Sequence, residues 1–154
     1  MADAADTLHL DLAAGRVTIR LRADLAPGHC ARITELAAAG FYDGVVFHRV
    51  IAGFMAQTGD PTGTGRGGSG KKLKAEFSKQ PFVRGTVGMA RSQSPDSGDS
   101  QFFIMFDEGA FLNGQYTVWG EVVEGMEHVD AIKHGEPPAK PDKIVKLRSA
   151  DAAA

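Results

Sequence analysis

The chain has 154 residues, enough for one domain with a substantial core. Hydrophobic residues make up 43% and charged residues 23% of it, as is typical of a soluble globular protein. A formal net charge of −2 argues against a basic surface that holds a phosphate backbone, so nucleic acid is not expected as a partner. No run of about eighteen apolar residues is present, which argues against a membrane span.

The ends of the chain and its single cysteine bear on where the protein works. MADAAD at the start lacks the basic residues and the apolar run of an export signal. Cys30 has no second cysteine with which to form an internal disulfide, and a small buried residue is its favoured interpretation. We therefore expect a cytoplasmic protein with one domain over residues 1–154, frayed at 1–6 and 150–154.

The first third of the chain predicts a β-hairpin, a helix and a further strand. Apolar and polar residues alternate on both sides of a turn at 14–15, and an acidic residue and a proline precede a helical apolar pattern that ends at Gly40. The expected elements are a hairpin over 8–12 and 17–22, a helix over 27–39 and a strand over 45–51.

The rest of the chain predicts a glycine loop, short strands and a second helix. Residues 59–70, GDPTGTGRGGSG, show no hydrophobic period. Strands are then expected at 82–83, 86–90, 101–106, 117–122 and 143–147, and a helix over Met126, Val129 and Ile132. Many short strands with two helices favour a mainly β fold, a closed or nearly closed antiparallel barrel.

The strand expected over 101–106, QFFIMF, is mostly apolar on both faces. Alternate side chains of a strand point to opposite faces, so one set can enter the core while the other lines an outer groove. The first set is Phe102, Ile104 and Phe106, and the second is Gln101, Phe103 and Met105.

Two short motifs in the glycine loop resemble nucleotide-binding signatures. Gly63 to Gly68 fits G-x-G-x-x-G, and Gly65 to Lys71 fits G-x-x-x-x-G-K. The first needs a βαβ unit, and the second needs a Ser or Thr at the position of Lys72 and a helix after it. The lysine-rich KKLKAEF follows instead. A flexible surface loop is therefore favoured, and no cofactor is predicted.

Metal and hydrolytic chemistry find no support in the sequence. The five histidines show no i, i+4 pair and no cysteine partner, so no metal site is predicted. Asp96 and Asp99 lie in the polar segment SQSPDSGDS and are interpreted as solvated turn residues.

Residues 47–60, FHRVIAGFMAQTGD, place Arg49 and Gln57 in an otherwise apolar run. An arginine in a strand is most often an edge residue that pairs with a carboxylate, and the neighbouring Phe54 and Met55 can be core residues. Alternatively, these side chains form a functional groove with the outward face of 101–106. The residues by themselves leave both interpretations open.

Four segments together resemble a known family: FHRVIAGFMAQTGD, GTVGMARS, SQFFIMF and FLNGQYTVWG are similar to the successive signatures of the cyclophilin peptidyl-prolyl isomerases. The resemblance extends over nearly the whole chain. It implies an eight-stranded antiparallel β-barrel capped by two α-helices, with a shallow outer groove that binds Xaa-Pro peptides. It also implies a cis–trans isomerase that assists protein folding without a cofactor. We expect a monomer.

The resemblance also assigns roles to individual residues. Arg49 corresponds to the catalytic arginine, Phe54 and Met55 to the floor and wall of the proline pocket, and Gln57 to a residue that helps to hold arginine and substrate. The other implied substrate-binding positions are Ala90, Arg91, Ser92, Gln101, Phe103, Phe111, Leu112 and Tyr116. His48 can be either a groove residue or a satisfied strand histidine, and the second interpretation is slightly favoured.

Three positions depart from the best-known cytosolic members of the family. Phe111 stands where those carry tryptophan, Tyr116 where they carry histidine, and Arg91 where asparagine is common. Because phenylalanine has no indole N–H, weaker binding of the inhibitor cyclosporin is expected. A non-catalytic module that binds proline-containing segments on the same fold is the alternative function.

Overall fold

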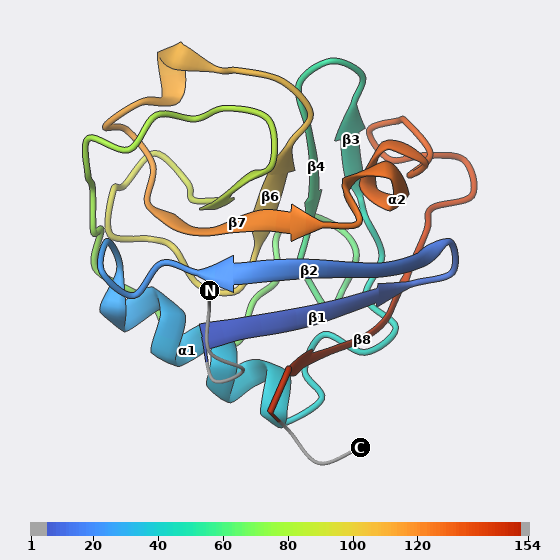
Figure 1. Cartoon of the computed structure of the whole chain (residues 1–154), viewed down its shortest axis with the longest axis horizontal. Helices are drawn as coiled ribbons and strands as arrows, with labels where there is room; N and C mark the ends of the chain where they lie inside the picture. Colours follow the sequence, from blue (N-terminus) through green and yellow to red (C-terminus); the bar gives the residue numbers. More distant parts are fainter. Residues whose placement is uncertain (1–5, 152–154) are drawn as a thin grey trace.

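The computed structural model describes residues 6–151, and within them one eight-stranded antiparallel sheet packs with two α-helices (Figure 1). The strands are β1 Thr7–Leu12, β2 Gly15–Leu21, β3 Arg49–Ile51, β4 Met55–Thr58, β5 Thr86–Met89, β6 Phe102–Met105, β7 Val118–Glu124 and β8 Ile144–Ser149. The helices are α1 Pro27–Ala38 and α2 Met126–Asp130, with a 3₁₀ turn, η2, at Ala110–Leu112. The fraying expected at 1–5 and 152–154 lies outside the described residues, while Ala150 N–H donates to the Thr7 carbonyl.

The sheet has the order β3-β4-β6-β5-β7-β2-β1-β8 and curls round its core. In Figure 1, β1, β2 and β7 run across the view, whereas β3, β4 and β6 run up and down. Among residues 6–151 the strand ladders end at β3 and β8, which do not pair with each other. Residues 44–47 and 142–144 bond across this gap, for example from Phe47 N–H to the Asp142 carbonyl at 2.9 Å. The sheet is thus open and curled. The hydrogen bonds between residues 44–47 and 142–144 connect its two edges, and we call this connection the seam.

Most expected elements form, and three differ. The strand expected over 45–51 is regular only at β3. Residues 82–83 are irregular because their N–H groups donate to the side chains of Asn113 and Thr86 and not to a neighbouring strand. Strand β4 was not predicted as a separate element. It forms because the chain reverses at Gly53, whose φ of +73° suits glycine, so that β4 pairs back on β3.

The prediction that 101–106 divides its side chains between two faces is confirmed. Phe102, Ile104 and Phe106 belong to the main core, where Phe102 meets Trp119 edge to face with ring centroids 5.3 Å apart. The opposite face of β6 carries a second apolar cluster, made of Met55, Phe82, Phe103, Met105, Leu112 and Val118. One strand therefore joins the main core to an outer apolar surface.

The start of helix α1 is capped by a residue from a distant loop. Ala26 at its start offers no capping side chain, and Glu76 accepts instead from the backbone N–H of Gly28 and His29. The prediction of a buried Cys30 is confirmed, and burial raises the pKa of its thiol to about 12. The thiol is therefore neutral at physiological pH.

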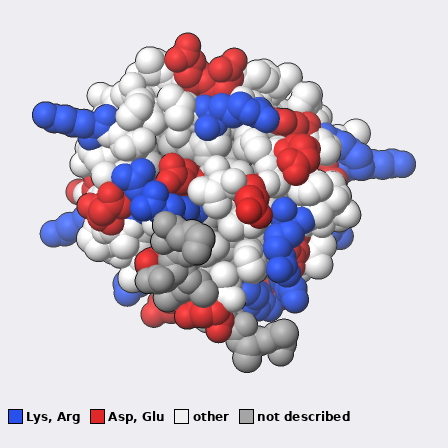
Figure 2. Space-filling model, viewed as in Figure 1, with Lys and Arg blue, Asp and Glu red and all other residues white. Residues whose placement is uncertain are grey.

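The surface shows no dominant charge on the face seen in Figure 2, where acidic and basic side chains are intermixed. Among residues 6–151, no helix combines the length and the apolar character needed to cross a membrane. Over the same range, His, Cys, Asp and Glu side chains form no group of three or more that could hold a metal ion.

Candidate functional site

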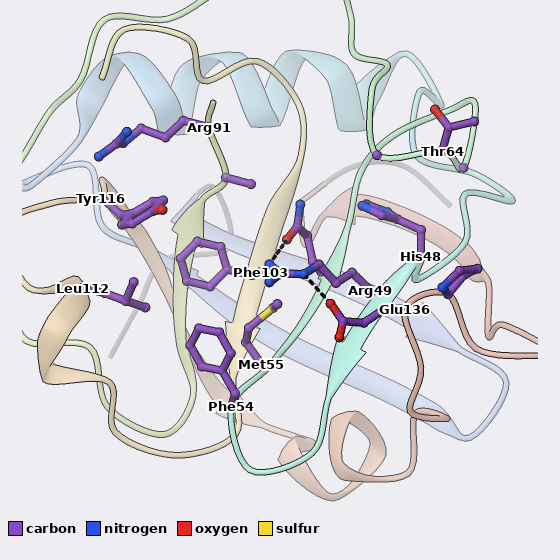
Figure 3. Close-up of a pocket in the computed structure, with 15 residues that line it drawn as sticks. His48, Arg49, Phe54, Met55, Thr64, Arg91, Phe103, Leu112, Tyr116 and Glu136 are labelled. Atoms are coloured by element: carbon purple, nitrogen blue, oxygen red, sulfur yellow. Dashed lines mark hydrogen bonds and ion pairs between the residues drawn. The ribbon is translucent and has the colours of Figure 1, made fainter. Parts of the chain in front are cut away.

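A hollow of about 480 Å³ opens over the second apolar cluster (Figure 3). It brings together most of the residues that the sequence singled out: Arg49, Phe54, Met55, Gln57, Ala90, Arg91, Phe103, Leu112 and Tyr116. The remaining three lie close by. Ser92 and Gln101 line an adjoining hollow of about 530 Å³, and the ring of Phe111 lies 5.5 Å from that of Phe54.

The floor of the hollow is apolar because β4 and β6 turn alternate side chains outward. Met55, Phe103 and Leu112 are buried there. Phe103 stacks on Phe82 with ring centroids 5.7 Å apart and meets the edge of Tyr116 at 5.8 Å. A rigid apolar surface of this kind suits a small aliphatic ring, which gains free energy as its surface leaves water.

Arg49 stands at the edge of this floor and has two partners. Its Nε donates to a carboxylate oxygen of Glu136 at 3.1 Å, and its Nη1 donates to the side-chain oxygen of Gln57 at 3.4 Å. Its side chain is 44% exposed, and β3 is an edge strand. Arg49 is therefore an edge residue paired with a carboxylate, and it also lines the hollow.

A chain of amides sets the orientation of Gln57. Gln101 donates through Nε2 to the carbonyls of Gly65 and Gly67, each at 3.0 Å, and its oxygen accepts from Gln57 Nε2 at 2.9 Å. Because a backbone carbonyl can only accept, Gln101 must present its NH₂ group there. Gln57 must then turn its own NH₂ to Gln101, which leaves its oxygen facing Arg49.

The glycine loop is an ordered wall of the site, contrary to the expectation of a flexible surface loop. The buried carboxylate of Asp60 accepts from the backbone N–H groups of Thr62, Thr64 and Gly65. Burial would raise the pKa of Asp60, yet the hydrogen bond from the Thr62 hydroxyl, together with backbone N–H groups that include those of Thr62 and Gly65, holds it well below its usual value. The carbonyls that orient Gln101 are thereby held in place.

Asp99 holds the far end of the same loop, so the interpretation of this residue as a solvated turn residue was wrong. Its carboxylate accepts from the N–H groups of Ser69 and Gly70, at 2.9 and 3.0 Å. Neither role is visible in the sequence. Asp99 binds backbone about thirty residues away, whereas Asp60 binds backbone two to five residues ahead of it in a glycine-rich segment without a regular pattern.

His48 differs from its expected role. It is buried and lines the hollow, and among residues 6–151 no partner is bonded to its Nδ1. Burial, with a smaller effect from the nearby Arg49 charge, lowers the pKa of His48. The ring is therefore neutral at physiological pH, and Arg49 supplies the positive charge beside it.

Arg91 uses its donors within the chain. Nε and Nη2 donate to the Gln115 carbonyl at 3.1 and 2.8 Å, Nη1 donates to the carbonyls of Ser92 and Gln93, and the guanidinium lies 4.5 Å from the centre of the Tyr116 ring. These contacts hold Tyr116 at the rim of the hollow.

Further residues line the hollow that the sequence did not single out: Gly63, Thr64, Gly65, Glu136 and Pro137. The first three come from the glycine loop. The other two come from a segment more than eighty residues after β3, and no local pattern could have indicated that it meets Arg49.

Comparison with known proteins identifies relatives of this chain. A family model described as cyclophilin type peptidyl-prolyl cis-trans isomerase/CLD matches residues 7–150. A Brucella suis protein named "Probable peptidyl-prolyl cis-trans isomerase" is 56% identical over 162 residues, which cover 94% of this chain and 83% of the relative. The human peptidyl-prolyl cis-trans isomerase-like 3 is 43% identical over 132 residues, covering 82% of this chain and 80% of the relative.

Solved structures agree with these relatives. The crystal structure of the cyclophilin AquaCyp293 from Hirschia baltica matches with a TM-score of 0.91 and 30% identity, over 99% of this chain and 77% of that one. A Cryptosporidium parvum cyclophilin type peptidyl-prolyl cis-trans isomerase, crystallised in the presence of the dipeptide Ala-Pro, matches with a TM-score of 0.86 and 28% identity. That match covers 93% of this chain and 98% of that one.

Replacing Asp60 by Asn should loosen the glycine loop and reduce the acid sensitivity of the fold. The depressed pKa of Asp60 means that its carboxylate stabilises the folded state above the unfolded pKa of about 3.9, and that this contribution is lost as the pH falls toward the folded value. We expect Asp60→Asn to lower the free energy of unfolding at pH 7 by roughly 1–3 kcal/mol.

Urea unfolding between pH 7 and pH 3 measures this effect. The difference between parent and variant should shrink as the pH falls. Asp96→Asn is the control, since Asp96 accepts one exposed backbone bond, from Ala75. A difference between parent and Asp60→Asn that stays constant with pH would contradict the prediction.

Proposed function

Because the chain belongs to the cyclophilin-type peptidyl-prolyl cis-trans isomerase family, we propose that it accelerates rotation about Xaa-Pro peptide bonds and so assists the folding of other proteins. The observation that carries this proposal is the position of Arg49, a donor held by two acceptors at the edge of a rigid apolar floor.

The reaction itself explains why such a site suffices. Rotation of a peptide bond must break amide resonance, which presents a barrier of about 18–20 kcal/mol, and uncatalysed X–Pro exchange takes tens to hundreds of seconds. No bond to another atom forms or breaks, so the step requires no nucleophile. At the twisted transition state the prolyl nitrogen regains a lone pair that can accept a hydrogen bond. A donor placed there stabilises the transition state more than either planar ground state, and so raises the rate.

Arg49 has donors left for this purpose. A guanidinium carries five N–H groups, and Glu136 and Gln57 each accept from one nitrogen. Among residues 6–151, no group accepts from Nη2 of Arg49. The guanidinium is accessible to water, since the Arg49 side chain is 44% exposed. A bound peptide would displace that water and strengthen the hydrogen bond to the prolyl nitrogen.

The apolar floor completes the proposed mechanism. Met55, Phe103 and Leu112 would hold the proline ring while the carbonyl that precedes it turns past Arg49. Gln57, Ala90 and Arg91 line both hollows, and the residues before proline would lie in the adjoining one, beside Gln101.

The second candidate is a module that binds proline-containing segments without accelerating their cis–trans isomerisation. The apolar floor alone would serve it equally well. The hydrogen-bonded chain that orients Gln57 toward Arg49 favours the enzyme, because simple retention of a proline ring does not require an aligned donor. Magnetisation exchange on a short Xaa-Pro peptide decides between them, since only the enzyme accelerates the exchange.

We also propose that the hydrogen bonds between the two edges close the curled sheet into a barrel. We further propose that the protein is a cytoplasmic monomer. Bonds between residues 44–47 and 142–144 support closure. The intermixed charges of the face in Figure 2 and the buried Cys30 are compatible with a monomer in a reducing compartment.

Replacing Arg49 by Ala should slow catalysed exchange by roughly 10²–10³, the usual effect of losing one preorganised donor. The fold should persist because the side chain is exposed. Arg16→Ala is the matched control, since Arg16 is also a strand arginine in an exposed ion pair, with Asp11, and does not line the hollow. An Arg49→Ala protein as fast as the parent would remove Arg49 from the mechanism.

Replacing Phe111 by Trp should tighten cyclosporin binding by roughly 1–2 kcal/mol, or about 5- to 30-fold, because it adds an indole N–H donor. Phe111 is 71% exposed, so the larger ring should fit without repacking. Isothermal titration of parent, Phe111→Trp and Phe111→Leu measures the effect. Equal dissociation constants for parent and Phe111→Trp would contradict it.

If the barrel is closed, the amide protons of Phe47 and Ile144 should exchange with solvent as slowly as those of the strand ladders. Both donate across the seam, to Asp142 and Val45. Hydrogen exchange followed by NMR tests this, with Leu10 of the β1–β2 ladder as the protected reference. Exchange at seam amides as fast as in exposed turns would show an open edge.

A further inference from the structure

Glu136 is the one carboxylate bonded to Arg49 within residues 6–151, and it also lines the hollow. Figure 3 shows its side chain reaching the guanidinium from below, with Thr64 of the glycine loop above. We propose that Glu136 is a positioning residue, which acts by holding the guanidinium of Arg49 in its productive orientation. This inference rests on the proposed catalytic role of Arg49.

Backbone pairing brings Glu136 to this place. Gly135 and Val50 exchange two hydrogen bonds, each of 2.8 Å, so the segment around Gly135 lies antiparallel along the free edge of β3. In an antiparallel pair, the neighbour of Gly135 lies beside the neighbour of Val50 on the same face. Glu136 is therefore the cross-strand partner of Arg49, just as Gln57 is its partner on β4.

The segment keeps its path independently of the ion pair. Gly135 has a φ of +147°, and a Cβ at this position would lie 2.5 Å from Cα of Pro138, so only glycine fits. The N–H of Lys133 donates to Asp142 at 2.8 Å on the other side of Gly135. Removing the Glu136 side chain should therefore leave the wall of the hollow in place.

The two partners of Arg49 restrain different nitrogens of its guanidinium. Glu136 holds Nε and Gln57 holds Nη1, and two acceptors on different nitrogens fix the plane of the guanidinium. The bond to Gln57, at 3.4 Å, is at the long limit for a hydrogen bond and would restrain the group poorly by itself. The ion pair is 44% and 57% exposed, so it adds little to stability. Its effect should fall on catalysis.

Glu136→Ala should therefore lower kcat by roughly 3- to 10-fold, the factor that corresponds to ordering one long side chain. KM should change little, because the apolar floor stays intact. Glu136→Gln keeps an oxygen acceptor for Nε and should recover most of the rate. Glu121→Ala is the matched control, since Glu121 forms an exposed ion pair with Arg20 away from the hollow. Its kcat should equal that of the parent.

A double-mutant cycle shows whether Glu136 acts through Arg49. In the Arg49→Ala background, Glu136→Ala should have no further effect on exchange of a short Xaa-Pro peptide. In NMR spectra, the Arg49 Nε proton should exchange with water faster in Glu136→Ala than in the parent, with Glu136→Gln between them. The unfolding temperature should not change.

Three results would overturn the inference. A Glu136→Ala protein with parental or higher kcat would show that the carboxylate does not assist Arg49. An equal loss in both backgrounds would show that it acts elsewhere. An Arg49→Ala protein as active as the parent would remove both this inference and the proposed role of Arg49, whereas a slow Arg49→Ala with a fast Glu136→Ala would remove only this inference.

Discussion

The site depends on one constraint, which is that a backbone carbonyl can accept a hydrogen bond but cannot donate one. Two carbonyls of the glycine loop, at Gly65 and Gly67, fix the amide of Gln101, and the direction of every later donor follows from them up to Arg49. The loop can set this direction because buried Asp60 binds its backbone. Asp60 is not itself a lining residue, but it binds the N–H groups of Thr64 and Gly65, which are, and so helps to orient Gln57 toward Arg49.

Packing supplies the second requirement, a floor that does not move. Strand β6 places Phe102 and Ile104 in the main core and Phe103 and Met105 in the outer cluster. Any displacement of the floor would therefore disturb the core as well. A densely packed interior resists such displacement, so the outer face of the strand is as rigid as its inner face. This coupling lets a shallow, open hollow keep a defined shape without a lid.

The sequence predicted what is local and missed what depends on long-range pairing. The alternation in 101–106 predicted both faces of β6, and the four segments that resemble the cyclophilin signatures together predicted most of the lining of the hollow. Strand β4 was missed because the turn at Gly53 lies inside an apolar run. Asp60, Asp99 and Glu136 were missed for a different reason. Asp99 and Glu136 act on groups that only the folded chain brings near. Asp60 binds backbone two to five residues ahead of it, but an acid in a polar segment looks the same whether it is solvated or buried.

Arg49 can be an edge residue paired with a carboxylate and can also fill the catalytic role proposed for it. An edge strand leaves one side of its backbone free, and here that side pairs with the segment around Gly135. The pairing supplies a carboxylate, as edge arginines usually find. The exposure that makes this ion pair weak as a source of stability also leaves further N–H groups of Arg49 accessible to a peptide. A buried arginine would have all its donors bonded within the protein and none for a substrate. The edge of the sheet is therefore the place where an arginine can be both held and available.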